Sequence, residues 1–235
     1  MKNRFFFTAG IVGMLSGVAS GATDGADVGY GREWNPYVTL RGGWLFGGKA
    51  EGDFSESDHP EKNSNLKETI KNAWSGSVEF GVSCFDDWVF AGLELGYFTG
   101  KVNFKIQDEH DGIMHFPAEF GNTFAACNVT LRYPFGERGF WYGGVGAGIV
   151  RVSMTGNVDI GGGEKMGCGA KAWSFLGQGF AGVGWYLNDN WQLTIGYRLR
   201  YVPDTINWRY GKVNEECEIE QDLSHAAEVG LVYRF

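Results

Sequence analysis

Apolar and polar residues alternate strictly along several short segments of the chain, which is the pattern of a β-strand with one apolar face. The clearest segment is the last one, residues 223–235. One of its faces is apolar except for His225, whereas the other carries Glu228 and Arg234. The chain ends on Phe235, which still belongs to the apolar face. A terminal strand of this kind is typical of a barrel whose apolar face meets lipid.

The same alternation predicts eight strands. They cover residues 37–47, 74–83, 88–99, 123–133, 141–152, 173–187, 191–201 and 223–235. The connections after the first, third, fifth and seventh strands are long and polar, whereas the others are short turns. An even number of strands joined in this way predicts an all-β fold, an eight-stranded antiparallel up-and-down transmembrane β-barrel with four long external loops. Within the first long loop, residues 65–72 are expected to form a short helix.

Aromatic residues fall at both ends of the predicted apolar faces. The band at the short-turn end consists of Trp88, Tyr133, Trp185, Trp191 and Phe235. The band at the long-loop end consists of Trp44, Trp74, Tyr97, Trp173 and Tyr201. Tryptophan and tyrosine gather where a membrane meets water. The two bands therefore predict two membrane interfaces, one at each end of the strands.

The first residues of the chain predict export. Lys2 and Arg4 precede an apolar run over residues 5–18, and small residues follow. This order is that of a cleaved secretory signal peptide. We therefore divide the chain into a signal peptide, a flexible periplasmic leader and the barrel, at residues 1–21, 22–35 and 36–235.

Charge and composition narrow the class of protein further. Loss of Lys2 and Arg4 with the signal peptide takes the formal net charge from −8 to −10, so we expect no nucleic-acid partner. The chain holds 38 glycines and only 5 prolines, and tryptophan and phenylalanine are both frequent. Glycine and aromatic residues in short alternating segments favour a barrel over a sandwich or a disordered chain.

The last strand also carries the pattern polar-x-Gly-x-x-aromatic-x-aromatic, in Glu228, Gly230, Tyr233 and Phe235. It resembles the C-terminal signal by which bacterial outer-membrane barrels are recognised for assembly. Over its mature length the chain resembles the small, porin-family-like outer-membrane barrels of the OmpA/OmpX type. The stretches that carry this likeness are residues 144–150, 182–201 and 228–235.

This resemblance implies a location in the outer membrane of a Gram-negative-type bacterium. The partners that it implies are outer-membrane lipid and lipopolysaccharide, the barrel-assembly machinery and an unknown partner of the external loops. We expect no cofactor.

The face opposite the apolar one points into the predicted barrel. Its charged residues are Arg41, Glu79, Glu94, Arg132, Arg198, Arg200, Glu228 and Arg234. An eight-stranded barrel is wide enough only for side chains, so these charges must pair. The planar guanidinium of arginine suits such pairing with carboxylates. We expect an ion-pair network that plugs the lumen, and the alternative is a narrow or gated ion pathway.

Four cysteines remain in a chain that we expect to be exported, and disulfides form in exported proteins. Cys168 lies in the third long loop and Cys217 in the fourth, on the same side of the predicted barrel. Cys84 lies in a turn on the opposite side, and Cys127 lies on the lipid face. We therefore predict a disulfide between Cys168 and Cys217.

Two groups of acidic residues and histidines in the loops are candidate metal ligands. They are Asp53, Glu56, Asp58 and His59 in the first loop, and Asp108, Glu109, His110, Asp111 and His115 in the second. Such charge runs are usually solvated loop tips, so we expect no metal site.

Ser224 and His225 are the one candidate catalytic pair. Some eight-stranded barrels are lipid A-modifying enzymes, including a deacylase with a Ser/His pair on late strands. Adjacent residues of a regular strand point to opposite faces, so these two cannot act as nucleophile and base. A structural or surface-interaction role through four acidic external loops is therefore favoured, and the alternatives are a lipid A acyl hydrolase or transferase, or a narrow pore.

Overall fold

The computed structural model describes residues 34–46, 49–55, 64–69, 71–85, 87–108, 112–159, 165–203, 205–209, 216–221 and 223–235. The expected signal peptide and nearly all of the expected leader lie outside the described residues. Both remain predictions from the sequence.

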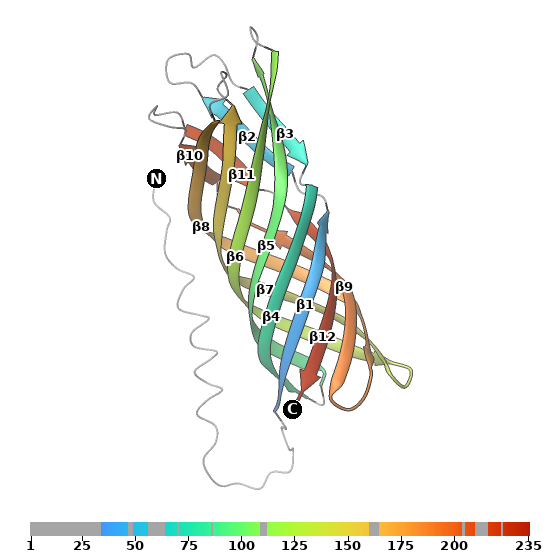
Figure 1. The fold of residues 1–235 in the computed structure, drawn as a ribbon. Coiled ribbons are helices and arrows are strands. Elements are labelled where there is room, and N and C mark those ends of the chain that lie inside the picture. Colours follow the sequence, from blue (N-terminus) through green and yellow to red (C-terminus); the bar gives the residue numbers. More distant parts are fainter. Residues whose placement is uncertain are drawn as a thin grey trace, which may run out of the picture. The chain divides into compact units, whose positions relative to one another are not determined.

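Eight long strands carry the alternation that the sequence predicts. They are β1 (Asn35–Phe46), β4 (Lys71–Cys84), β5 (Val89–Asp108), β6 (Gly112–Phe135), β7 (Gly139–Asp159), β8 (Lys165–Tyr186), β9 (Trp191–Tyr201) and β12 (Ser224–Arg234). They close into one barrel in the order β1-β12-β9-β8-β7-β6-β5-β4, and every neighbouring pair is antiparallel (Figure 1). The predicted eight-stranded all-β barrel is confirmed.

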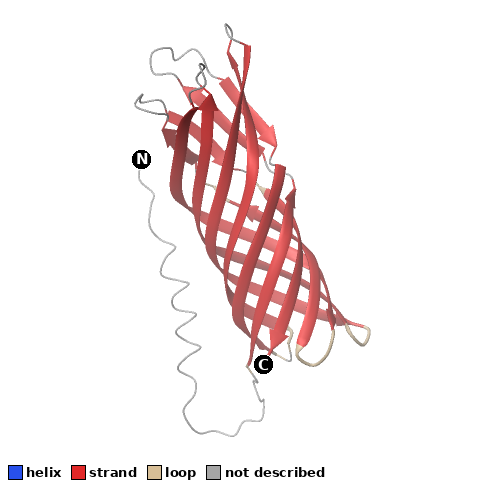
Figure 2. Cartoon of the chain, in the orientation of Figure 1, coloured by secondary structure: helices blue, strands red, loops and turns tan. Residues whose placement is uncertain are grey.

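Four short strands form a second sheet in two of the long connections. They are β2 (Lys49–Ser55), β3 (Ser64–Thr69), β10 (Thr205–Arg209) and β11 (Glu216–Gln221), in the order β10-β11-β2-β3. Figure 2 shows strands and turns throughout the described part of the chain. None of the described residues belongs to a helix that is long and apolar enough to cross a membrane.

The long connections are more regular than the sequence predicts. The helix expected over residues 65–72 is wrong, because β3 pairs with β2 from Ser64 to Thr69. Between β5 and β6, and between β7 and β8, the barrel strands continue into the predicted loops as paired hairpins. Pairing satisfies the backbone N–H and C=O groups of these polar segments. Because β2 pairs with β11 of another connection, the local sequence does not reveal this sheet.

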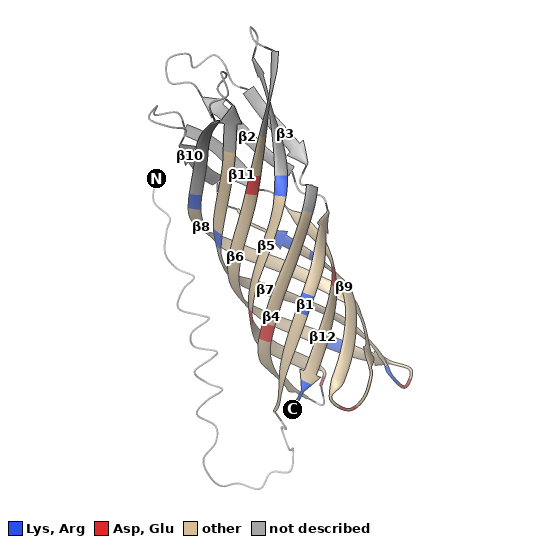
Figure 3. Cartoon of the chain, viewed as in Figure 1, with Lys and Arg blue, Asp and Glu red and all other residues tan. Residues whose placement is uncertain are grey.

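Side chains alternate between the outer surface and the lumen along each barrel strand. On β9, Ile195 is 47% exposed on the outer surface, whereas Arg198 is 1% exposed in the lumen. The ten aromatic residues of the two predicted bands are all exposed, as predicted. Charged positions are sparse along the barrel strands (Figure 3). The outer surface of the barrel is therefore an apolar belt bordered by aromatic rings.

The lumen contains an apolar layer near the long hairpins. It is formed by inward-facing side chains of β5, β6 and β7, each no more than 3% exposed: Phe98, Phe120, Phe124, Val150 and Val152. Phe98 lies 6.5 Å from Phe120 and 6.0 Å from Phe124 between ring centres. Burial of these rings removes a large apolar area from water.

The short-turn end of the barrel holds the last residue of the chain in place. The Phe235 amide donates to the Pro36 carbonyl at 3.1 Å, and the Arg234 amide donates to the Asn190 carbonyl at 2.9 Å. The Arg234 guanidinium also forms an ion pair with Asp87 in the turn after β4. The terminal strand is thereby bonded to both of its neighbours up to its last residue.

Candidate functional site in the barrel lumen

Glu94 on β5 lies at the centre of a polar network that fills the middle of the lumen. Its side chain has no exposed surface. Ser77 donates to one carboxylate oxygen at 2.6 Å. Asn128, Gln178 and Arg198 donate to the other, at 2.7, 3.0 and 2.8 Å. A carboxylate with this many charged and polar donors is compensated for its loss of water.

Glu79 on β4 carries the second carboxylate of the network, and it is paired with Arg41. It accepts hydrogen bonds from Tyr37 at 2.5 Å, from Arg41 at 2.9 Å and from Asn128 at 2.6 Å. Arg41 also lies 3.6 Å from Glu94, so it joins the two carboxylates. A Cβ atom at Gly92 would lie 2.6 Å from the Tyr37 hydroxyl oxygen, so an inward glycine makes room for this cluster.

Glu228 on β12 is the third carboxylate of the network. Arg198 donates to one of its oxygens at 2.8 Å, and Arg200 donates to the other at 2.7 Å. Because Arg198 also bonds Glu94, the charges alternate without interruption from Glu79 to Arg200. The Nε and Nη1 atoms of Arg200 have no partner in the described structure.

The network spans the barrel from side to side. Glu94 and Arg198 come from β5 and β9, which lie opposite each other in the strand order. Side chains of seven barrel strands take part, and β7 instead presents inward glycines. A Cβ atom at Gly146 would overlap the Asn128 side-chain oxygen. The glycines of β7 therefore leave the space that the amides of β6 and β8 occupy.

Two of the predicted lumen arginines lie apart from the three glutamates. Arg132 donates to the side-chain oxygen of Gln192, and its guanidinium carbon lies 3.4 Å from the ring centre of Phe90 and 4.6 Å from that of Phe140. Arg234 pairs with Asp87 at the short-turn end. The structure therefore brings six of the eight predicted residues into one network: Arg41, Glu79, Glu94, Arg198, Arg200 and Glu228.

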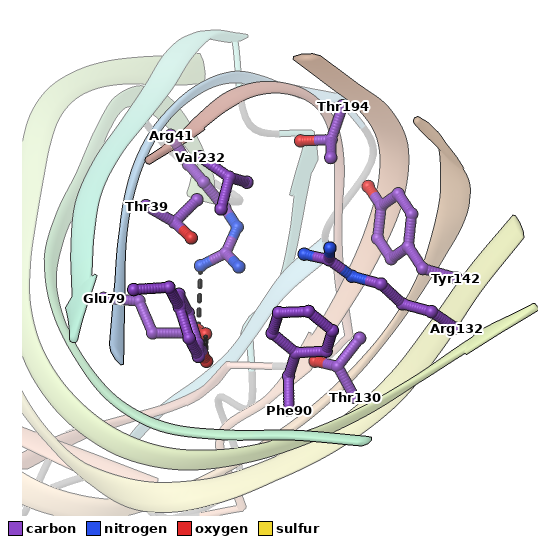
Figure 4. Close-up of a pocket in the computed structure, with 10 residues that line it drawn as sticks. Thr39, Arg41, Glu79, Phe90, Thr130, Arg132, Tyr142, Thr194 and Val232 are labelled. Carbon is purple, nitrogen blue, oxygen red and sulfur yellow. Dashed lines mark hydrogen bonds and ion pairs between the residues drawn. The ribbon is translucent and has the colours of Figure 1, made fainter. Parts of the chain in front are cut away.

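A small cavity separates Arg132 from this network (Figure 4). Its volume is about 20 Å³, which is room for little more than one water molecule. Arg41 and Arg132 extend into it from two sides. Thr39 and Tyr142 are among the other polar residues that line it.

Sequence reasoning missed four polar contributors to the lumen and its short-turn end: Tyr37, Ser77, Asp87 and Gln192. Tyr37 lies an even number of residues from Arg41, and Gln192 lies an even number from Arg198, so each has its side chain on the same inward face as that arginine. A search of the inward face for every hydrogen-bonding residue would have found Tyr37, Ser77 and Gln192. Asp87 lies in a turn, where alternation gives no signal.

The residues of the predicted assembly signal divide between the two faces of β12. Glu228 belongs to the lumen network, and Gly230 faces the lumen beside Thr194 and Arg41. Tyr233 and Phe235 meet edge to face at the outer surface, with ring centres 5.0 Å apart.

The remaining candidates give no assembled site in the described residues. The side chains of Cys168 and Cys217 lie outside the described part, so their disulfide stays a prediction. The side chains of the candidate metal ligands in the first two long connections also lie outside the described part, so the expectation of no metal site there stays untested. Ser224 is buried at 5% exposure, whereas His225 faces outward and bonds the Tyr197 hydroxyl. The serine and the histidine therefore do not meet.

No protein-family model matches the chain, and no curated protein matches its sequence. Solved structures with similar folds include the outer membrane protease OmpT from Escherichia coli, with a TM-score of 0.55, 11% identity, and coverage of 86% of this chain and 97% of that one. A major outer membrane protein from Thermus thermophilus has a TM-score of 0.56 and 11% identity, with coverage of 86% of this chain and 99% of that one. The outer membrane protein AlkL, whose structure was determined in lipid bilayers, has a TM-score of 0.50 and 17% identity, with coverage of 91% of this chain and 95% of that one. At these identities the likeness shows the fold alone.

Proposed function

We propose that this chain, which has the fold of the small outer-membrane β-barrels, is a plugged barrel of the outer membrane with a structural or surface-interaction role. The observation that carries the proposal is the Glu94–Arg198 ion pair across the lumen, at 2.8 Å between atoms that are almost completely buried. A lumen crossed by paired charges is rigid and closed to solutes, so it suits an anchor for the connections outside it.

The outer surface supports residence in a membrane. Apolar side chains on the outer surface of the barrel strands are widely exposed, including Leu40 at 58%, Leu131 at 60% and Val145 at 68%. In water, a continuous belt of this kind would be an aggregation hazard. In lipid it is the favourable surface, and the closed ring satisfies every inter-strand bond.

The connections at the long-hairpin end support the surface role. The hairpins of β5–β6 and β7–β8 extend beyond the barrel core, and β2, β3, β10 and β11 form a sheet of their own. Binding residues are commonly carried on connections held by a rigid scaffold. We place the interaction with an external partner on these connections, three of which have more acidic than basic residues.

Two exposed cations favour contact with lipid headgroups at the same end. Arg151 and Lys171 lie on the outward faces of β7 and β8, where Arg151 pairs in register with the exposed Trp173. Long basic side chains next to an interfacial tryptophan can reach the phosphates of outer-leaflet lipid or lipopolysaccharide. We propose these lipids, together with the barrel-assembly machinery, as partners of the chain.

Location and topology are tested together by thiol labelling of intact cells. Single cysteines replace Lys165 and, as the matched control at the other end, Glu137, in a background without native cysteines. We expect a membrane-impermeant maleimide to label the first position and to reach the second only after lysis. Labelling of the Glu137 position from outside, or recovery of the protein in the soluble fraction, would contradict the proposal.

Conductance separates the plugged barrel from the pore. We expect the refolded native protein to show no steady current in planar bilayers, because buried ion pairs cross its lumen. A stable open channel would instead favour the pore. An acyl hydrolase or transferase is tested by incubating the same preparation with lipid A, where we expect no change in acylation.

A further inference from the structure

The charges of the described lumen do not balance. Four arginines face three glutamates there, and Arg234 has its own partner in Asp87. The three glutamates are shared among Arg41, Arg198 and Arg200. Arg132 is therefore the arginine without a carboxylate, although it is only 7% exposed. A buried charge without a counter-charge is costly.

The surroundings of Arg132 stabilise its charge but do not neutralise it. Phe90 and Phe140 offer ring faces, and Gln192 offers one amide oxygen. The Nε atom of Arg132 is buried without a hydrogen-bond partner in the described structure. Cation–π contacts and one neutral acceptor are weaker partners for a guanidinium than an anion is.

The cavity beside Arg132 offers donors that nothing else uses. Among the described residues, neither the Thr39 hydroxyl nor the Tyr142 hydroxyl has a hydrogen-bond partner, and both residues line the cavity. Arg41 lines it from the other side (Figure 4). Glu79 also lines it, but both of its oxygens already accept hydrogen bonds from other residues.

We propose that this cavity binds one chloride-sized anion between Arg41 and Arg132, as the counter-ion of Arg132. Guanidinium and hydroxyl groups are the donors that such an ion accepts from. A volume of about 20 Å³ suits a monatomic ion better than a larger anion such as phosphate or sulfate. The bound anion completes the charge balance of the lumen and binds the folded barrel only.

Linkage makes the site measurable through stability. We would unfold the refolded barrel in urea at constant ionic strength, with sodium chloride replaced stepwise by sodium gluconate. Above the dissociation constant, each tenfold rise in chloride should lower the apparent unfolding constant about tenfold. Equal unfolding midpoints in chloride and in gluconate would overturn the proposal, because the cavity would then hold water only.

Two matched variants assign the effect to Arg132. Arg132→Gln removes the unbalanced charge and should abolish the difference between chloride and gluconate. Arg151→Gln makes the same change on the outward face of β7 and should keep it. An Arg132→Gln barrel with the native chloride dependence would contradict the assignment.

A third variant and a direct measurement remain decisive if Arg132→Gln fails to fold. Tyr142→Phe keeps all charges and removes one donor, so the chloride concentration for half of the effect should rise several-fold. In crystals grown with sodium bromide, we expect an anomalous peak between Arg41 and Arg132. An unchanged half-effect concentration in Tyr142→Phe, or a cavity without bromide, would count against the site.

Discussion

The Glu94-centred network and the apolar layer occupy neighbouring levels of the same lumen. The guanidinium carbon of Arg200 lies 5.5 Å from the ring centres of both Phe98 and Phe124, so the two levels touch. Both are almost completely buried. In the network the three glutamates and Arg198 each have several specific partners, whereas in the apolar layer the side chains have only packing neighbours.

This difference predicts two responses to substitution. Loss of one charge leaves its partners buried and unpaired, so the effect spreads through the network. Loss of part of an apolar side chain leaves a local void. A polar group stranded in the apolar layer behaves in a third way, because its removal relieves a cost. Urea unfolding of the refolded barrel, followed by tryptophan fluorescence, separates these cases.

The largest effect is expected for Glu94→Gln. The substitution keeps the shape of the side chain but leaves Arg198 and Arg41 with one carboxylate fewer. We expect the free energy of unfolding to fall by about 3–5 kcal/mol, the usual cost of breaking a buried pair. A loss below about 1 kcal/mol would mean that water, rather than Glu94, compensates the arginines.

Glu228→Gln is expected to have the next largest effect, and its double variant is the sharper test. Arg200 has Glu228 as its only carboxylate in the described structure, so the single change leaves Arg200 unpaired. Glu228→Gln combined with Arg200→Met removes both charges and should cost less than Glu228→Gln alone. Additive losses in the double variant would show that the two side chains act independently.

Asn122→Leu should stabilise the barrel. Asn122 faces the lumen between Phe120 and Phe124 with no exposed surface, and neither of its amide atoms has a partner in the described structure. An apolar side chain of similar size removes that cost, so the free energy of unfolding should rise by about 1–2 kcal/mol. Asn122→Asp is the control, because it keeps the size, adds charge and should destabilise. A destabilised Asn122→Leu barrel would indicate an ordered water bound to the amide.

The smallest effect is expected for Lys101→Gln. Lys101 and Glu119 form an ion pair at 3.0 Å, nearly as short as those of the lumen, but their side chains are 66% and 64% exposed. Exposed pairs contribute little, so the change should be within about 0.5 kcal/mol. A loss as large as that of Glu228→Gln would show that distance, rather than burial, sets the value of an ion pair here.

The sequence predicts the barrel well because alternation is a local signal. The inward parity of Arg198 and the outward parity of Ile195 follow from one short segment. The second sheet could not be predicted, because β2 pairs with β11, which lies far along the chain. A polar segment such as residues 64–69 has no apolar face to distinguish a strand from a helix.

The candidate site was predictable in composition but not in pairing. Parity places Glu94 and Arg198 in one lumen, but alternation does not fix the stagger between strands. Their contact depends on the register of every strand between β5 and β9. The separation of Arg132 from the glutamates depends on that stagger too. The sequence could therefore identify the eight charged residues of the lumen but could not predict which of them form ion pairs.

The pairing of β1 with β12 determines when the barrel can close during folding. Val38 pairs with Tyr233, and the Phe235 amide bonds Pro36, so the first strand receives its second neighbour only from the last residues. Contacts this distant in sequence form slowly. Until they form, one edge of β1 is an open template for another strand. The interval between the synthesis of β1 and the arrival of β12 is therefore when the chain is most exposed to pairing with a second copy of itself.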